Sequence, residues 1–278
     1  MPVIKILTLM DDASSENKAL RSEHGLSFWV EAGDRRFLFD CGSGPATLYN
    51  ANRLGVSLKD ADFTVCSHSH YDHAAGFRDM AEAGFGGKTL YTGAGFWERK
   101  YAWNGLKYTD LSSGFGQEFL REHAVTQKIC RGLLPLADGC WLVGDFPRVH
   151  PFETIPRRFV KGTPPETTAD DFSDEICLAM RTERGLVVLV GCSHPGILNM
   201  MRHVHEVLKQ PIYALFGGTH LVEADEERIG TTVNTLCGMG LSILGLSHCS
   251  GNAAEKYLAA GRSVQTCHMT AGDCIAIR

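Results

Sequence analysis

Three histidines and one aspartate fall within six residues, directly after a short apolar run. The segment 65–73 reads VCSHSHYDH. His68 and His70 are two residues apart at a predicted strand end, so in extended backbone both side chains point to one side. Asp72 and His73 follow in the turn and can reach a neighbouring position. Imidazole and carboxylate groups are favoured ligands of zinc, iron(II) and manganese, so the segment predicts a divalent-metal site.

Three more histidines follow apolar runs that read as buried strands. They are His194 in LVVLVGCSHPG, His220 in YALFGGTHL and His248 in LSILGLSHCSG. In an open α/β sheet the carboxyl ends of the strands meet at the ligand crevice, so these side chains are expected to face the 68–73 segment. We predict His194 and His248 as metal ligands and keep His220 as a further candidate. For each of the three, the alternative is a hydrogen-bonded structural role.

The elements that must carry these residues alternate between strand and helix in both halves of the chain. Each half begins with a hairpin, and no repeat of fixed length is present. This order favours two sheets with helices on their outer faces. The expected strands cover 3–9, 26–32, 35–42, 61–66, 88–92, 140–144, 176–181, 186–190, 212–216, 241–246, 263–267 and 273–277. The expected helices cover 46–54, 196–209, 226–237 and 253–260.

The regular pattern weakens between residues 97 and 171, which we interpret as an inserted lid or substrate segment. Its first part is rich in aromatic residues between Trp97 and Phe119, which either stack on a flat ring or pack in the core. Its last part, 151–171, is polar and rich in proline. Long stretches of this kind in compact domains are usually lids or binding loops, or else disordered, so we expect a loop there.

Composition places the chain among globular proteins. Of its 278 residues, 44% are hydrophobic and 21% are charged, with a formal net charge of −5. Scattered lysines and arginines give no footprint for nucleic acid. No run of about 18 apolar residues predicts a membrane span. The N-terminus reads as a strand and not as a signal peptide, so the ten cysteines are expected to be reduced thiols in a cytoplasmic protein.

The HxHxDH pattern at 68–73, with His194 and His248 after later strands, resembles the metallo-β-lactamase superfamily. A closer resemblance is to its dihydropteroate-synthase-like branch of metal-dependent hydrolases. That match is carried by HGLSFWVEAG, FLFDCGSG, SHSHYDHAAGF, GDFPR, ICLAMRTERGLVVLVGCSHPGILN, FGGTHL and SHCSG. The resemblance implies an α+β fold, a four-layer αββα sandwich with its metal site at one edge of the two sheets. It also implies one domain over 1–278, with the insert at about 97–171.

The resemblance also implies how the ligands divide. His68 and His70 would bind one metal ion, whereas Asp72, His73 and His248 would bind a second. Many relatives place a bridging aspartate where this chain has Cys192. The bridge is therefore absent, replaced by His194 or supplied by Cys192, and the site holds one ion or two. Zinc is the expected metal, with iron or manganese as alternatives.

Four residues are assigned to roles around the metal. Asp72 is also the predicted catalytic residue, because a ligand carboxylate can accept the proton of a metal-activated water. Asp40, in the loop after a buried strand, is implied by the resemblance to orient the ligand imidazoles. Arg148 is a candidate for holding a substrate phosphate or carboxylate, and Tyr71 for donating a hydrogen bond to the substrate.

These assignments predict an enzyme acting on a small molecule, as a monomer or a homo-oligomer. The leading hypothesis is a metal-dependent hydrolase of an ester, lactone or phosphoester. A second hypothesis, implied by the resemblance, is a transferase or synthase that joins a dihydropterin to an aminobenzene ribosyl phosphate. A third is an iron-binding redox or sensor protein.

Overall fold

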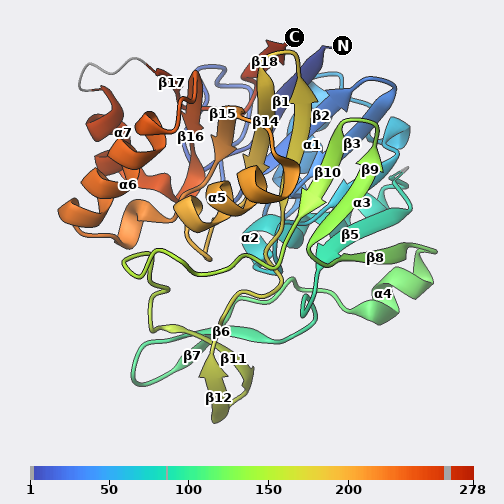
Figure 1. The fold of residues 1–278 in the computed structure, drawn as a ribbon. Helices are drawn as coiled ribbons and strands as arrows, with labels where there is room; N and C mark the ends of the chain where they lie inside the picture. Colours follow the sequence, from blue (N-terminus) through green and yellow to red (C-terminus); the bar gives the residue numbers. More distant parts are fainter. Residues whose placement is uncertain (1–2, 86, 260–263) are drawn as a thin grey trace.

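The computed structural model of the chain describes residues 3–85, 87–259 and 264–278. Two seven-stranded sheets form its centre (Figure 1). The first has the strand order β18-β1-β2-β3-β4-β5-β8. Its strands are β1 (Ile4–Met10), β2 (Ser27–Ala32), β3 (Arg35–Phe39), β4 (Phe63–Val65), β5 (Thr89–Gly93), β8 (Thr126–Cys130) and β18 (Cys274–Ile277).

The second sheet has the order β17-β16-β15-β14-β13-β10-β9. Its strands β14, β15, β16 and β17 run parallel to one another, and this places their carboxyl ends at one edge. The bounds are β9 (Leu133–Ala137), β10 (Cys140–Val143), β13 (Cys177–Thr182), β14 (Gly185–Val190), β15 (Ile212–Gly217), β16 (Ile243–Leu246) and β17 (Gln265–Cys267).

Successive side chains of each strand point to opposite faces of its sheet, and this alternation builds the layers. In β3, Phe37 and Phe39 face the second sheet, where they pack in one cluster with Leu189 and Phe216. Leu38, between them, packs on the opposite face against helices. The outer layers are α1 (Pro45–Arg53) and α3 (Gly76–Glu82) on the first sheet, and α5 (Ile197–Leu208), α6 (Glu226–Gly238) and α7 (Gly251–Ala259) on the second.

These layers confirm the expected four-layer αββα sandwich (Figure 1). Residues 260–263, where one predicted helix ends and one predicted strand begins, lie outside the described residues. Within the part that is described, no helix combines the length and the apolar character needed to cross a bilayer.

A third, four-stranded sheet lies at one end of the sandwich, with the order β12-β11-β6-β7 (Figure 1). Its members are β6 (Lys100–Trp103), β7 (Tyr108–Asp110), β11 (Phe159–Thr163) and β12 (Glu166–Ala169). The segment 97–171 is therefore divided, because β8, β9 and β10 belong to the two large sheets. That its small sheet acts as a lid stays a prediction.

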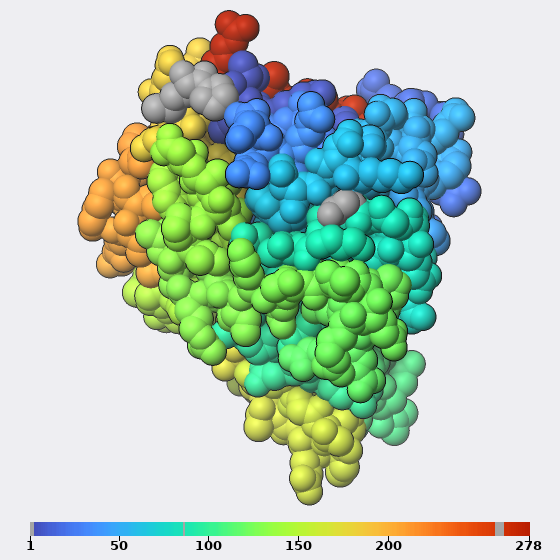
Figure 2. Space-filling model, turned by 90° about the vertical axis from the view of Figure 1, so that its right-hand side faces the viewer, coloured from blue at the N-terminus to red at the C-terminus, as the bar shows by residue number. Residues whose placement is uncertain are grey.

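The prediction of a loop over 151–171 is wrong in its second half. Residues 159–169 form the β11–β12 hairpin, which projects from the body in Figure 2. Strand β11 pairs with β6, so that Val160 lies opposite Tyr101. Pairing between segments about sixty residues apart leaves no trace in local sequence periodicity, and the surrounding prolines obscure the two short strands.

A buried ion pair joins the small sheet to the rest of the molecule. Lys100 on β6 is only 1% exposed. Its Nζ lies 2.5 Å from Asp174 Oδ1, 3.3 Å from Asp170 Oδ2 and 4.3 Å from the centre of the Phe172 ring. Burial acts to lower the pKa of Lys100, but the two carboxylates outweigh it and hold that pKa above its usual value. Asp174 also accepts a hydrogen bond from the backbone N–H of Ser69.

Replacing the Lys100 ammonium group should therefore destabilise the fold. Lys100→Met leaves two carboxylates buried without their cation, and we expect it to lower the free energy of unfolding by about 3–5 kcal/mol. Arg99→Ala is the matched control, because it removes an exposed pair with Asp110 on the same sheet, worth roughly 0–1 kcal/mol. Urea unfolding measures both. A loss below 1 kcal/mol for Lys100→Met would contradict this account of the small sheet.

Candidate metal centre

The predicted histidine segments meet at one edge of the two large sheets. Residues 66–73 follow β4, residues 191–196 follow β14, His220 follows β15 and His248 follows β16. All six histidines of these segments are at most 9% exposed. The convergence has a simple cause, because each side chain lies just beyond the carboxyl end of a buried strand.

One cluster combines Asp72, His73, Cys192 and His248, whose candidate ligand atoms all lie within 4.8 Å of one another. His73 Nε2 lies 3.0 Å from Cys192 Sγ and 3.1 Å from His248 Nε2. Asp72 Oδ2 lies 3.4 Å from His248 Nε2 and 3.7 Å from His73 Nε2. Carboxylate, imidazole and thiol groups at these separations could surround a single divalent ion.

A second cluster contains His68, Cys192 and His194. The His70 ring lies beside it, with its centre 4.8 Å from that of His68 and 5.1 Å from that of His194. Burial, above all, lowers the pKa of each of these three histidines well below its usual value, so the imidazoles are neutral. Nε2 of His68, Nε2 of His70 and both ring nitrogens of His194 are buried and have no hydrogen-bond partner within the described part of the chain.

Unpartnered buried nitrogens are costly unless another group satisfies them. A neutral imidazole has a free electron pair on one nitrogen, which is what a metal ligand needs. The donor set of both clusters therefore fits a divalent ion.

Cys192 belongs to both clusters, at the position where the resemblance predicted either a bridge or a gap. The residue before Cys192 is Gly191, where an added Cβ would lie 2.1 Å from Ser67 Oγ. Only glycine lets the 191–196 backbone approach the 67–73 segment this closely. The thiol consequently lies between the two groups of histidines.

Carboxylates and a hydroxyl lie behind the clustered imidazoles. Asp40 Oδ2 is 2.7 Å from His73 Nδ1, and the same carboxylate accepts hydrogen bonds from the backbone N–H and the Oγ of Ser67. Ser67 Oγ in turn lies 3.0 Å from His68 Nδ1. Asp12 Oδ1 lies 2.7 Å from His248 Nδ1. Such partners fix the tautomer and the orientation of a ligand imidazole.

Asp12 was not among the predicted site residues, although its position at a strand end was a signal for it. Asp12 follows β1 by two residues, and the rule that located the histidines at strand ends applies to it equally.

His24 was also not among the predicted site residues, yet it borders the first cluster. Its Nε2 lies 3.2 Å from Asp72 Oδ2, and its Nδ1 lies 2.8 Å from Asp12 Oδ2. The hydrogen bond to Asp12, with a further one to Asp72, raises the pKa of His24 to about 10. Burial acts to raise the pKa of Asp72, but His73, His24 and His248 outweigh it and hold that pKa well below its usual value. More than half of the His24 side chain is exposed, so it marks the open side of the cluster.

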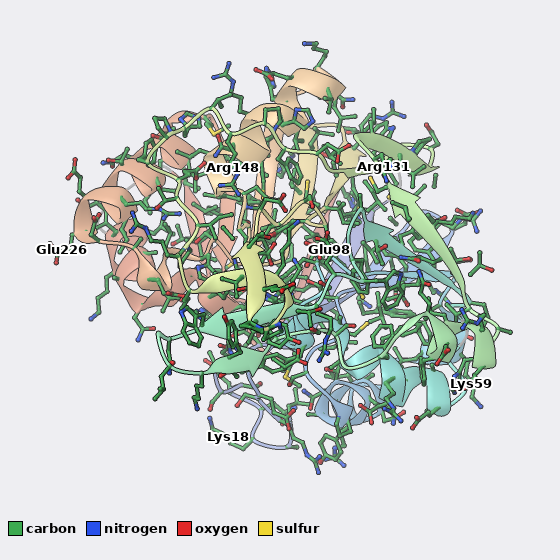
Figure 3. All side chains as sticks on the ribbon, turned by 90° about the horizontal axis from the view of Figure 1, so that it is seen from below. Lys18, Lys59, Glu98, Arg131, Arg148 and Glu226 are labelled. Atoms are coloured by element: carbon green, nitrogen blue, oxygen red, sulfur yellow. The ribbon has the colours of Figure 1, made fainter. Side chains whose placement is uncertain are left out.

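Three other predicted residues lie at varying distances from the clusters. The His220 ring is 4.5 Å from that of His194, centre to centre. Tyr71 is half-buried, and its ring centre lies 6.2 Å from that of His24. The Nη2 of Arg148 donates to the backbone carbonyl of Asp171 at 3.3 Å. In Figure 3, Arg148 and Lys18 lie on opposite sides of the small sheet.

The aromatic residues of the insert pack largely on one another. The Trp97, Phe115 and Phe119 rings form consecutive contacts, and Phe115 also contacts Phe77 on α3. Together with charged neighbours, the first three line a groove of about 1070 Å³ beside α4 (Gln117–Glu122). One lining residue of the groove, Ser112, pairs its backbone with that of His70 in the metal segment.

Comparisons with known proteins agree with this architecture. A structure described as Tm1679, a metal-dependent hydrolase of the β-lactamase superfamily, superposes with a TM-score of 0.85 at 26% identity, covering 99% of both chains. The metallo-β-lactamase fold protein YhfI from Bacillus subtilis gives a TM-score of 0.59 at 12% identity, over 99% of this chain and 100% of that one, which is a likeness of fold alone.

A curated relative from Methanocaldococcus jannaschii is 31% identical over 91% of this chain and 90% of its own length. It is named 7,8-dihydropterin-6-methyl-4-(β-D-ribofuranosyl)-aminobenzene-5′-phosphate synthase. The family model of the metallo-β-lactamase superfamily matches residues 21–170, more than half of the chain. With this match and the fold described above, the chain belongs to the metallo-β-lactamase superfamily.

Proposed function

We propose that the chain is a metal-dependent enzyme with a centre for two divalent ions. The observation that carries this proposal is the pair of buried clusters that share Cys192, beside which His68, His70 and His194 keep ring nitrogens that no described residue hydrogen-bonds. Mixed nitrogen, sulfur and oxygen donors suit zinc best, because a thiolate favours it over manganese. The ligands that we assign are His68, His70 and His194 around one position, Asp72, His73 and His248 around the other, and Cys192 between them.

A divalent ion held there would act as a Lewis acid, stabilising negative charge that develops on a substrate oxygen or a leaving group. The ionised Asp72 carboxylate is the acceptor for a proton released during the reaction, because its Oδ2 lies at the open side of the site. His24 Nε2, 3.2 Å away, holds that carboxylate in place by hydrogen bonding.

Two aromatic rings exclude water from the other side of the centre. The Phe172 ring is stacked on that of His194, with their centres 3.8 Å apart. The Phe159 ring is only 4% exposed and contacts both His70 and His194. A drier site strengthens the electrostatic interactions within it.

We infer that the substrate is a phosphorylated pterin-like molecule and that the reaction is a group transfer. The support is the curated synthase, whose identity of 31% extends over nearly the whole of both chains. In this reaction the aminobenzene nitrogen forms a bond to the methylene carbon of a dihydropterin pyrophosphate. The carbon–oxygen bond breaks, pyrophosphate leaves with its electron pair, and Asp72 accepts the proton that the nitrogen loses. Arg148 remains our candidate for binding a substrate phosphate outside the metal centre.

Hydrolysis of an ester, lactone or phosphoester is the second candidate. It is supported by the Tm1679 protein, which is described as a metal-dependent hydrolase and shares 26% identity with this chain. Here the oxygen of a water molecule forms a bond to the acyl carbon or phosphorus, and Asp72 accepts a proton of that water. The bond to the alcohol oxygen breaks, and the alcohol leaves with the electron pair and takes up a proton. Both reactions use the same residues, so a choice between them needs a measurement on substrates.

Incubation of the purified protein with a dihydropterin pyrophosphate and an aminobenzene ribosyl phosphate provides that measurement. We expect mass spectrometry to detect the coupled pterin together with one pyrophosphate per product, and omission of the aminobenzene to abolish pyrophosphate release. Release of pyrophosphate at the same rate without the aminobenzene favours hydrolysis instead. Absence of both products over the pH range in which the protein is folded would contradict the substrate assignment.

His70→Ala tests the metal centre itself. Removing this imidazole takes one donor from the cluster of neutral histidines, so we expect the metal content, measured by elemental analysis, to fall by about one ion per chain. His205→Ala is the control, because His205 is exposed on α5 and should leave the metal content unchanged. Full occupancy in the His70 variant would sink the proposal.

Cys192→Ala tests the shared position. A bridging thiolate contributes to both ion sites, so its loss should weaken the binding of two Co²⁺ ions and remove the thiolate-to-cobalt absorption in the near ultraviolet. Cys274→Ala, at an exposed cysteine, should change neither property. If the Cys192 variant keeps the absorption of the wild-type protein, the sulfur is not a ligand.

A further inference from the structure

Two adjacent acids just before β13 hold both ligand segments by their backbones. Asp174 Oδ2 accepts a hydrogen bond from the N–H of Ser69, between His68 and His70, at 2.9 Å. Glu175 Oε1 accepts from the N–H of Ser193 at 2.5 Å, and its Oε2 accepts from that of His194 at 2.9 Å. Asp174 and Glu175 are each only 1% exposed.

The 191–196 segment depends on such an external acceptor. Ser193 has a φ of 62° and Gly196 a φ of 100°, so the segment is neither strand nor helix. Its buried N–H groups at 193 and 194 consequently have no place in a regular hydrogen-bond ladder. A buried donor left without an acceptor destabilises the folded chain, and Glu175 satisfies two such donors with one side chain.

The next residue extends the connection to the other segment. The N–H of Ile176 donates to the carbonyl of Ser67 at 2.8 Å. Residues 174–176 therefore form hydrogen bonds with the segment that carries His68 and His70. They also form hydrogen bonds with the segment that carries Cys192 and His194. The relative placement of the two groups of ligands depends on this short stretch of backbone.

We propose that Glu175 is a positioning residue of the metal centre, whose carboxylate fixes the 191–196 backbone so that Cys192 and His194 meet the histidines of the 68–73 segment. Asp174 performs the matching task at Ser69. The inference rests on the proposed metal centre and adds to it a residue that is not a ligand. Partners of this kind typically change metal affinity by about 10–100-fold when they are replaced.

The chain offers a matched control in Glu153. Its carboxylate also accepts two backbone N–H groups, those of Leu198 and Asn199, at 2.9 and 2.8 Å. It is 4% exposed, and it holds the first turn of α5, beyond the ligands on the same stretch of chain. Glu153→Gln therefore removes comparable hydrogen bonds without loosening Cys192 or His194.

The experiment compares Glu175→Gln with Glu153→Gln by Co²⁺ titration and thermal unfolding. A glutamine at 175 places an NH₂ group against one of the two N–H donors. We expect Co²⁺ affinity to fall about 10–100-fold, with weaker thiolate-to-cobalt absorption. Glu153→Gln should lower the melting temperature but keep the affinity and the spectrum of the wild-type protein.

The outcomes separate the inference from the proposed function. Wild-type affinity and spectrum in Glu175→Gln, or equal losses in both variants, would overturn the positioning role alone. If the wild-type protein binds no Co²⁺, the metal centre fails and the inference fails with it. Should Glu175→Gln not fold, Glu175→Asp decides, because its shorter carboxylate reaches only one N–H. An affinity between those of Glu153→Gln and His194→Ala supports the role, and wild-type affinity refutes it.

Discussion

The burial of histidine nitrogens at one sheet edge is the constraint on which the rest of this structure depends. A buried polar group without a partner costs about 1–3 kcal/mol, and several imidazoles are gathered here. The fold meets the constraint by placing a polar group behind most of the ligand positions. Asp40 holds His73, Asp12 holds His248, Ser67 contacts His68, and Glu175 holds the backbone of His194. Nε2 of His68, Nε2 of His70 and the ring nitrogens of His194 have no such group among the described residues, and we assign one nitrogen of each of these imidazoles to a metal ion.

Strand ends bring these groups together. A buried strand fixes the position of its last residue, and the first residues beyond it can turn toward the edge without breaking the sheet. The close approach of neighbouring segments then demands small residues. At Gly191 a Cβ would collide with Ser67, and at Gly218 one would lie 2.6 Å from Cys249 Sγ. The glycines before the histidines in GCSH and GGTH are consequently part of the site, since any side chain there would separate its two halves.

The same logic explains how much could be predicted from the sequence. The strands before His194 and His248 are continuous apolar runs and the strand before His68 is short and buried, so both the sandwich and the convergence of the histidines were predictable. Glu175 was not, because its function is visible only when a loop 18 residues later presents two N–H groups to it. The pairing of β11 with β6 was hidden for the same reason. Local patterns report burial and periodicity, whereas these features are contacts between distant segments.

The small sheet and the metal centre share one wall. Lys100 of β6 binds Asp174, which holds Ser69, and Phe159 of β11 contacts His70 and His194. Any shift of this sheet is therefore transmitted to the ligand segments by an ion pair and an aromatic contact. In our proposal the ligand side chains at this edge of the two sheets hold the metal ions. Group transfer and hydrolysis would both use these ions. In that proposal Phe159 of the small sheet closes one side of the site, and the half-exposed His24 with Tyr71 beside it leaves the other side as the entrance for a second reactant.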